Sequence, residues 1–234
     1  MSEELGLERE PDVAAELFGD RINLARQYTE SLALRGEELG LIGPLEVPRL
    51  WSRHIVNCAL VAPLLKPGLV GDIGSGAGLP GLVLAIARPD VDFVLIEPME
   101  RRTDWLAAES ARLGLMNVVV ERSRSQDAPY AEGLSQITAR AVTALSKLIP
   151  STEHLLAPGG EMVFMKGARI DEEIEAAAKV IRKARLHDVE SLVLGEGITP
   201  EITRVFRARV DQFGRRLGRH HTSPFMQYQR ESFT

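Results

Sequence analysis

The chain has 234 residues, enough for one large domain or for one domain with a small appendage. Apolar residues make up 44% and charged residues 26%, which is ordinary for a globular protein, and the net charge of −5 argues against a protein that coats nucleic acid indiscriminately. A single cysteine, Cys58, excludes an internal disulfide framework, and no apolar run is long enough to cross a bilayer. We therefore expect a reduced, cytoplasmic location and no membrane partner.

The first part of the chain is predicted to be helical. An apolar stripe at helical spacing, which includes Leu17 and Tyr28, predicts one helix over residues 12–38. A second helix is predicted over residues 48–65. We expect residues 1–66 to form an N-terminal helical extension.

A short apolar strand over residues 69–73 then leads directly into glycines, in the string Val70-Gly71-Asp72-Ile73-Gly74-Ser75-Gly76-Ala77-Gly78-Leu79-Pro80-Gly81, and a helix over residues 79–87 follows. Glycines at alternate positions let the backbone turn tightly and approach a flat ligand closely, and a helix N-terminus favours anionic groups. The next strand, over residues 91–96, ends at Glu97. Its carboxylate can accept two hydrogen bonds from the diol of a ribose.

The remaining elements alternate between helix and strand. They are a helix over residues 101–113, strands over 118–120 and 135–139, a helix over 146–156, a turn at 158–160, a strand over 161–165, a helix over 171–185 and strands over 189–194 and 202–210. This alternation predicts an α/β domain over residues 67–210, with a mostly parallel seven-stranded sheet covered on both faces. A basic tail over residues 211–234 follows it.

Two cofactors fit the glycine loop. Gly76-x-Gly78-x-x-Gly81, with an acid about 20 residues later, matches the dinucleotide fingerprint. Glycines that begin directly after Asp72 fit S-adenosylmethionine (SAM) better, because a carboxylate there would crowd a pyrophosphate but can help to orient the ammonium group of a methionine. We therefore favour a SAM-dependent methyltransferase with the Rossmann-like class I fold over a dinucleotide enzyme or a structural glycine turn.

Longer stretches of the sequence resemble one known family. The string from Asp72 to Gly81 resembles the loop of the RsmG family, also called glucose-inhibited division protein B. Several shorter pieces agree with this family in order and spacing, namely Arg53-His54-Ile55, Arg88-Pro89, Ser123-Arg124, Ala139-Arg140-Ala141 and Met165-Lys166-Gly167. The chain departs from the family at Asn57, where an Asp is usual, and at Gln126, where a Glu is usual.

The resemblance implies a SAM-dependent methyltransferase that acts on N7 of a guanine in small-subunit (16S) ribosomal RNA. Together with the glycine loop, it places the cofactor on Asp72, Gly74, Gly76, Gly78, Leu79, Glu97, Ser125, Gln126 and Arg140. Arg140 and Lys166 are the candidate catalytic residues, because each ends a strand at the edge of the sheet where ligands bind. Either can contact a phosphate or the guanine O6, although an arginine cannot clamp N7 during the reaction because N7 must stay free.

The chemistry of N7 methylation agrees with what the sequence lacks. N7 carries a lone pair and no proton, so alignment is needed rather than a general base. No Ser/His/Asp or Cys/His constellation and no metal-ligand spacing stands out, so we expect no metal, and a lone helical His54 is interpreted as a core or capping residue. Methylation of pyrimidine C5 needs a cysteine after the glycine loop, whereas Cys58 precedes it. Methylation of exocyclic amines commonly uses an Asn/Asp-Pro-Pro-Tyr/Phe segment where this chain has Thr138-Ala139-Arg140-Ala141.

Positive charge gathers at the end of the chain. Residues 201–234 hold seven arginines and three acids, whereas residues 1–40 hold four bases and ten acids. Arg204, Arg207 and Arg209 are expected to share one face of the last strand. The candidate RNA contacts are Arg124, Lys166, Arg207, Arg215 and Arg216, and the expected partner of this monomer is small-subunit ribosomal RNA or the ribosomal subunit.

Two other functions stay open on the sequence alone. The same fold serves methyltransferases of small molecules and of proteins, so the fold does not fix the acceptor. A non-catalytic RNA-binding or nucleotide-binding module that kept the loop is the third hypothesis. The arginines favour RNA, and the joint presence of Asp72, Glu97, Arg140 and Lys166 favours an enzyme.

Overall fold

One seven-stranded sheet organises the computed structural model, which describes residues 6–199 and 201–212. The strands lie in the order β3-β2-β1-β4-β5-β7-β6. Strands β1 to β5 pair in parallel, and β7 runs antiparallel to both of its neighbours, β5 and β6. Their bounds are β1 Leu69–Ile73, β2 Asp92–Ile96, β3 Val118–Glu121, β4 Leu134–Arg140, β5 Leu156–Lys166, β6 Leu186–Leu194 and β7 Thr203–Val210. The predicted α/β architecture with a mostly parallel seven-stranded sheet is confirmed.

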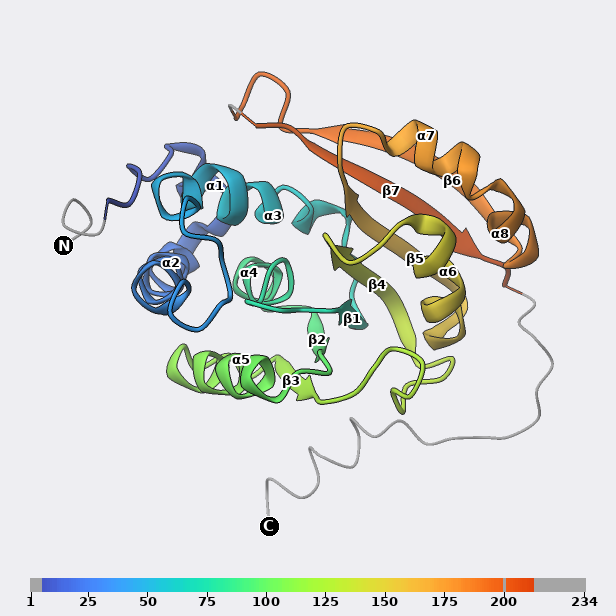
Figure 1. The fold of residues 1–234 in the computed structure, drawn as a ribbon, viewed down its shortest axis with the longest axis horizontal. Helices are drawn as coiled ribbons and strands as arrows, with labels where there is room; N and C mark the ends of the chain where they lie inside the picture. The colour runs from blue at the N-terminus through green and yellow to red at the C-terminus, as the bar shows by residue number, and fades with distance from the viewer. Residues whose placement is uncertain (1–5, 200, 213–234) are drawn as a thin grey trace, which may run out of the picture.

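Helices cover both faces of this sheet (Figure 1). One layer consists of α1 Val13–Phe18, α2 Ile22–Arg35, α3 Asn57–Ala59, α4 Gly81–Ala87 and α5 Glu100–Arg112, and the other of α6 Leu145–Thr152, α7 Ile170–Ala176 and α8 Ala178–Lys183. Because both faces are covered, four of the five residues of β1 and of β2 are buried.

The N-terminal helices belong to the same core as the sheet. Leu32 of α2 and Ile55 are fully buried in one apolar cluster with Val70 of β1 and Leu82 of α4. Residues from the predicted N-terminal extension therefore complete the packing of the sheet face on which α4 and α5 lie.

The N-terminal helices are more broken than the sequence predicts. The single helix expected over residues 12–38 is wrong, because Gly19 adopts a left-handed backbone (φ 51°) that ends α1, and a 3-10 turn precedes α2. The helix expected over residues 48–65 is also interrupted. Here a 3-10 turn, the π-helix Trp51–Val56, α3 and a second 3-10 turn follow one another.

Two further differences lie in the C-terminal half. The turn predicted at residues 158–160 does not end the strand but lies within β5 as a bulge. Leu156 pairs with Leu134 and Glu161 with Gln136, so the residues between them have no partner on β4, and Gly159 has a φ of 78°. The helix predicted over residues 171–185 is divided at Ala177 into α7 and α8.

Candidate functional site

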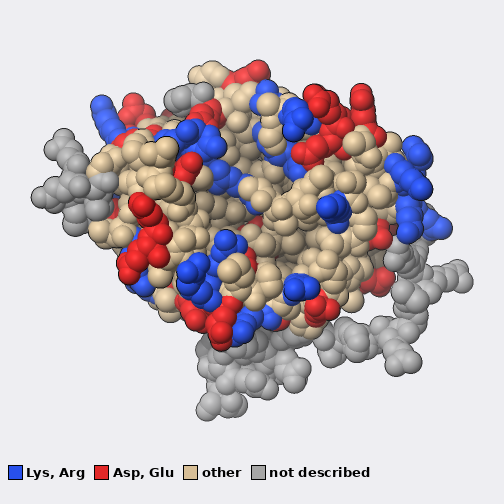
Figure 2. All heavy atoms as spheres, viewed as in Figure 1, with Lys and Arg blue, Asp and Glu red and all other residues tan. Residues whose placement is uncertain are grey.

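The carboxyl ends of the parallel strands meet at one edge of the sheet, here called the carboxyl edge. The register places Ile73, the last residue of β1, level with Ile96 of β2 and Ala139 of β4, so Glu97 and Arg140 flank the glycine loop. In Figure 2, Lys and Arg atoms lie on several sides of a hollow near the middle of the face shown, where β4 ends in Figure 1. Ligands of open α/β sheets bind at this edge.

The glycine loop, residues 74–80, has a backbone that side chains disfavour. The φ angles of Gly74, Gly76 and Gly78 are 67°, 54° and 100°, in the region that glycine adopts without strain. A Cβ at Gly74 would lie 3.1 Å from Val142, so even a methyl group would crowd this position. The loop therefore presents bare backbone to the carboxyl edge, as a cradle for a flat ligand must.

Hydrogen bonds to the buried carboxylate of Asp72 join β1 to β4 and to the end of this loop. Its Oδ1 accepts a hydrogen bond from Thr138 Oγ1 (2.8 Å), and its Oδ2 accepts one from the backbone N–H of Gly81 (3.1 Å), at the start of α4. Burial raises the pKa of Asp72 to about 6, against hydrogen bonds that lower it. Each oxygen still has a lone pair, so the expected contact with an ammonium group would be added to a carboxylate that already has two partners.

Glu97 holds the loop from the other side. This carboxylate is buried at the end of β2, where it accepts hydrogen bonds from the backbone N–H groups of Gly76 (3.0 Å) and Met99 (3.0 Å). The guanidinium of Arg102 lies 3.8 Å from it. Glu97 thus joins the glycine loop to the start of α5, and its remaining lone pairs are what a ribose diol would use.

Arg140 ends β4 and reaches across the carboxyl edge toward the N-terminal helices. Its Nη2 donates to the backbone carbonyl of Arg53 (3.1 Å), and its Nη1 donates to Cys58 Sγ (3.5 Å). The next residue, Ala141, has a left-handed backbone (φ 53°), which turns the chain sharply beside the glycine loop.

Lys166 ends β5 on the same edge, but its ammonium group is engaged within the protein. It donates to the backbone carbonyl of Thr143 (2.9 Å) and pairs with Glu173 of α7 (2.7 Å). Glu173 also accepts a hydrogen bond from the backbone N–H of Leu145 (3.2 Å). Lys166 therefore fixes the segment that follows Arg140, a function that its position at a strand end does not reveal.

His54 forms a pair with Glu46, 2.5 Å from Nε2 to the carboxylate. Burial lowers the pKa of His54 to about 4, with a further contribution from the charge of Arg140. Burial alone would raise the pKa of Glu46, but His54 and Arg53 outweigh it and lower that pKa. The imidazole is therefore neutral near pH 7, donates to Glu46 through Nε2, and leaves Nδ1 buried without a partner.

The residues predicted to lie near an adenine follow β3, which also ends at this edge. Ser125 Oγ donates to Gln126 Oε1 (3.3 Å). Gln126 and Arg124 are exposed, and Ser125 is half-buried. The fold therefore brings Asp72, Glu97, Ser125, Gln126, Arg140 and Lys166 to one edge, around the glycine loop.

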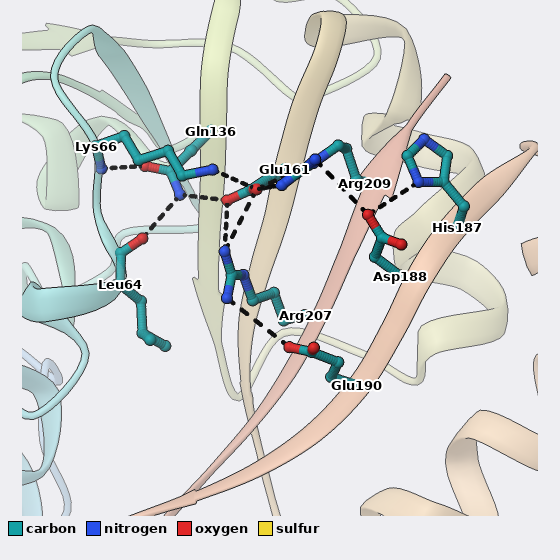
Figure 3. Close-up of polar contacts among 9 residues, drawn as sticks. All are labelled: Leu64, Lys66, Gln136, Glu161, His187, Asp188, Glu190, Arg207 and Arg209. Atoms are coloured by element: carbon teal, nitrogen blue, oxygen red, sulfur yellow. Dashed lines mark hydrogen bonds and ion pairs between the residues drawn. The ribbon is translucent and has the colours of Figure 1, made fainter. Parts of the chain in front are cut away.

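Arg207 lies elsewhere, in what we call the Glu161 cluster, formed by Glu161, Lys66, Gln136, Arg207 and Arg209 (Figure 3). The buried carboxylate of Glu161 accepts hydrogen bonds from Lys66 Nζ (2.6 Å) and Arg209 Nη2 (2.7 Å), and Arg207 Nη2 lies 3.4 Å away. Burial alone would raise the pKa of Glu161, but these cations outweigh it and lower the pKa to about 2. Glu161 lies five positions before Lys166 along β5, so the fold does not bring Arg207 to the carboxyl edge, and its RNA contact stays a prediction.

The expectation that Arg204 shares a face with Arg207 and Arg209 is wrong. Side chains of a strand alternate with a period of two, and three positions separate Arg204 from Arg207. The register pairs Arg204 with Lys166, and Arg209 with Glu161. Arg215 and Arg216 lie outside the described residues.

Neither a metal site nor a membrane span is found in the described part of the chain. Among residues 6–199 and 201–212, no three His, Cys, Asp or Glu side chains are placed to hold a metal ion. Within the same ranges, no helix has the length and apolar character that a membrane span requires.

Sequence reasoning missed Tyr28 and Trp105 as residues of the site. Both donate hydrogen bonds to a backbone carbonyl of the glycine loop, although neither is near it in sequence. Tyr28 stands in an apolar helical stripe, which predicts a core residue. The signal available was its hydroxyl, because a buried tyrosine hydroxyl usually has a hydrogen-bond partner.

A family model described as "GidB: rRNA small subunit methyltransferase G" matches residues 21–200. The protein named Ribosomal RNA small subunit methyltransferase G from Clavibacter michiganensis subsp. michiganensis (strain NCPPB 382) is 63% identical over 210 residues, which are 90% of this chain and 100% of that protein. The protein of the same name from Leifsonia xyli subsp. xyli (strain CTCB07) is 62% identical over 204 residues, 87% of this chain and 98% of that protein.

Solved structures share the fold at low sequence identity. A SAM-dependent methyltransferase from Aquifex aeolicus superposes with a TM-score of 0.54 at 16% identity, over 74% of this chain and 97% of that one. P. horikoshii TYW2 in complex with MeSAdo superposes with a TM-score of 0.55 at 17% identity, over 68% of this chain and 63% of that one. The chain is therefore similar to these methyltransferases in the arrangement of the sheet and its helices.

Proposed function

Because the chain belongs to the GidB family of rRNA small subunit methyltransferases, we propose that it methylates N7 of a guanine in 16S ribosomal RNA, with SAM as the methyl donor. The chain is a SAM-dependent rRNA methyltransferase. The observation that carries the proposal is the bare glycine loop at the carboxyl edge, flanked by Glu97 and Arg140, in a chain that matches this family along most of its length.

The residues around the loop fit SAM. The bare backbone of Gly74, Gly76 and Gly78 and the start of Leu79 would make the cradle, and a Cβ at Gly74 would crowd Val142 beside it. Glu97 would accept from the ribose diol, and the buried carboxylate of Asp72 would favour the ammonium group. Ser125 and Gln126, which follow β3, would lie beside the adenine. When bound, SAM supplies a methyl group that is already activated on a sulfonium.

Arg140 and Lys166 are the residues that would position the guanine. Arg140 lies beside the loop with its guanidinium at the carboxyl edge, where it can contact O6 or a phosphate without covering N7. Lys166 is bound to Thr143 and Glu173, so it holds the segment after Arg140 in place. The chain would therefore align guanine N7 with the methyl group of SAM through side chains that donate hydrogen bonds. Alignment is the main contribution that methyl transfer from an activated donor needs.

Neither a base nor a covalent nucleophile is required of this chain. N7 has no proton to remove, and the neutral His54 is already committed to Glu46. Cys58 is fully buried, and burial raises the pKa of its thiol to about 11, so it is not a thiolate near neutral pH.

Each of three segments of the chain is assigned a role in this activity. We assign residues 67–210 to the methyltransferase domain, residues 1–66 to a helical extension that completes its core, and residues 211–234 to a basic tail that contacts RNA. Arg124, which is exposed after β3, would contact the RNA near the site. The protein would act as a monomer in the cytoplasm, where its substrate is.

The test uses SAM labelled in its methyl group with purified small subunits and with naked 16S RNA. The expected product is labelled RNA that reductive aniline treatment cleaves at one guanine, because this chemistry breaks the chain at N7-methylguanine. Label on a base that resists cleavage would contradict N7 as the acceptor. Binding of SAM without transfer to either RNA would favour a non-catalytic module, and label on a protein or a small molecule would favour the other alternative.

A further inference from the structure

One backbone carbonyl of the glycine loop accepts two hydrogen bonds from distant helices. The carbonyl oxygen of Ala77 lies 2.8 Å from Tyr28 Oη and 2.8 Å from Trp105 Nε1. Tyr28 belongs to α2 and is fully buried, and Trp105 belongs to α5 and is 3% exposed. Two helices from different parts of the chain therefore converge on the loop from beneath.

This carbonyl fixes the orientation of a peptide group inside the loop. The same peptide unit ends in the N–H of Gly78, which donates to the carbonyl of Ser75 (2.7 Å). Gly78, which supplies this N–H, and Gly76, which precedes Ala77, both have positive φ angles. Because glycine populates positive and negative φ about equally, the loop's own sequence selects this arrangement only weakly, and hydrogen bonds from outside must hold it.

The two donors are held in place independently of the loop. Ser31 of α2 donates to Glu109 of α5 (2.8 Å), and Arg112, which pairs with the same carboxylate within α5, donates to the backbone carbonyl of Gln27 in α2 (3.2 Å). The guanidinium of Arg35 lies 5.5 Å from the centre of the Trp105 ring. These interactions fasten α2 to α5, so the side chains that reach Ala77 start from a rigid pair of helices.

We propose that Tyr28 and Trp105 are positioning residues for SAM, which hold the Ala77–Gly78 peptide so that the loop stays in the conformation that binds the cofactor. The proposal rests on the proposed function of the glycine loop as the SAM cradle. It gives the N-terminal helices a part in cofactor binding, although no N-terminal residue is among those expected to touch SAM.

The decisive variant is Tyr28→Phe, which removes one hydroxyl and keeps the ring in the core. Calorimetric titration with SAM and with its demethylated product should show Kd raised about 2- to 10-fold, which is the loss of affinity expected when one hydrogen bond is removed. Trp105→Phe should act in the same direction. The double variant should weaken binding by more than either single change, because the buried carbonyl is then left without a donor.

Thr29→Val is the matched control. Thr29 neighbours Tyr28 on α2, is fully buried, and donates its hydroxyl to Ala25 within the same helix (2.7 Å). Its replacement should lower thermal stability but leave the Kd for SAM unchanged. In Tyr28→Phe, saturating SAM should restore kcat and the KM for RNA should stay as in the wild type, since only the loop is affected.

Hydrogen exchange of the cofactor-free protein supplies a readout that does not depend on activity. The amides of residues 76–78 should exchange faster in Tyr28→Phe than in Thr29→Val. A wild-type Kd and wild-type exchange in Tyr28→Phe would overturn the proposal, as would equal weakening of SAM binding by Thr29→Val. If the wild-type protein itself failed to bind SAM, the proposed function would fail instead.

Discussion

At the scale of single residues, Glu97 combines two interactions that one substitution removes together. Its carboxylate accepts the backbone N–H groups of Gly76 and Met99 in the free protein, and it is the group that would accept a ribose diol. Glu97→Ala should therefore weaken SAM binding by ~1–3 kcal/mol, because two hydroxyl groups lose their partner. Calorimetry measures this change, with Glu100→Ala as control, since Glu100 is exposed and its carboxylate pairs with Arg122, away from the loop. Binding of NAD in place of SAM would contradict the assignment.

The pKa of Asp72 makes cofactor affinity depend on pH. Burial raises this pKa to about 6 in the free protein, and an ammonium group prefers the ionised carboxylate. The Kd for SAM should therefore rise as the pH falls below about 6 and stay flat above it. Titrations between about pH 5 and about pH 8 check the prediction, with Asp72→Asn expected to bind weakly at every pH. A Kd that is constant across this range in the wild type would count against the ammonium contact.

The rate of methyl transfer should behave differently from the affinity. At saturating SAM and RNA, kcat should be nearly flat from mildly acidic to mildly basic pH, since N7 has no proton to lose. His54, whose pKa is lowered to about 4, remains neutral over that range. Single-turnover rates measure this directly. A rise with an apparent pKa near 6 to 7 would reveal a base and contradict the mechanism.

At the scale of elements, strong periodic patterns were readable in the sequence and local interruptions were not. All seven strands could be predicted, the five parallel ones because buried strands leave apolar runs bounded by turn residues. A single glycine is a weak signal for the break at Gly19, and no local pattern marks the π-helix Trp51–Val56. At residues 158–160 the turn signal appears as an irregularity inside β5: no residue between Leu156 and Glu161 pairs with β4, and Gly159 has a φ of 78°.

The candidate site, too, could be predicted from the sequence only in part. The glycine loop, Glu97, Arg140 and Lys166 could be placed at one edge, because parallel strands carry their ends to a common side. The donors to Ala77 could not be found, since 49 residues separate it from Tyr28. Nor does the sequence show that Lys166 is paired with Glu173.

The junction of β5 and β7 should be stabilised by the Glu161 cluster. The lowered pKa of Glu161 means that the stabilisation is present above the ordinary pKa of 4.5 and is lost as the pH falls through about 2. Glu161→Gln should destabilise the protein by ~2 kcal/mol, less than the ~3–5 kcal/mol of a fully buried pair, because Lys66 and the two arginines keep contact with water. Urea unfolding tests it, with the exposed Glu190→Gln, which also removes a partner of Arg207, expected to cost under ~0.5 kcal/mol.

At the scale of the whole molecule, the uneven charge predicts how RNA binding responds to salt. Residues 213–234 hold four arginines and one acid in a chain of net charge −5. Truncating the chain after Gln212 should raise the KM for RNA and flatten its salt dependence. The slope of log affinity against log salt concentration should fall by roughly 0.7–0.9 for each phosphate that is no longer neutralised. SAM affinity should not change.

The comparison that checks this measures RNA methylation against salt for the full chain, the shortened chain, and a full-length chain with Arg215, Arg216, Arg219 and Arg230 replaced by Gln. Neutralising the arginines and removing the tail should have the same effect. Identical salt slopes in all three would eliminate the tail as an RNA-binding segment, and a parallel weakening of SAM binding would mean that it supports the fold.

The strand order β5-β7-β6 also dictates when this protein can finish folding during its own synthesis. β7 follows β5 and β6 in the chain, yet it pairs between these two strands, which are made before it. Until residue 210 emerges, β5 has an open edge, β6 has no partner in the sheet, and Glu161 lacks both arginines that neutralise it. An open strand edge is a template for pairing with other chains. The nascent protein therefore cannot complete its sheet step by step from the N-terminus, and the sheet closes only after β7 has emerged.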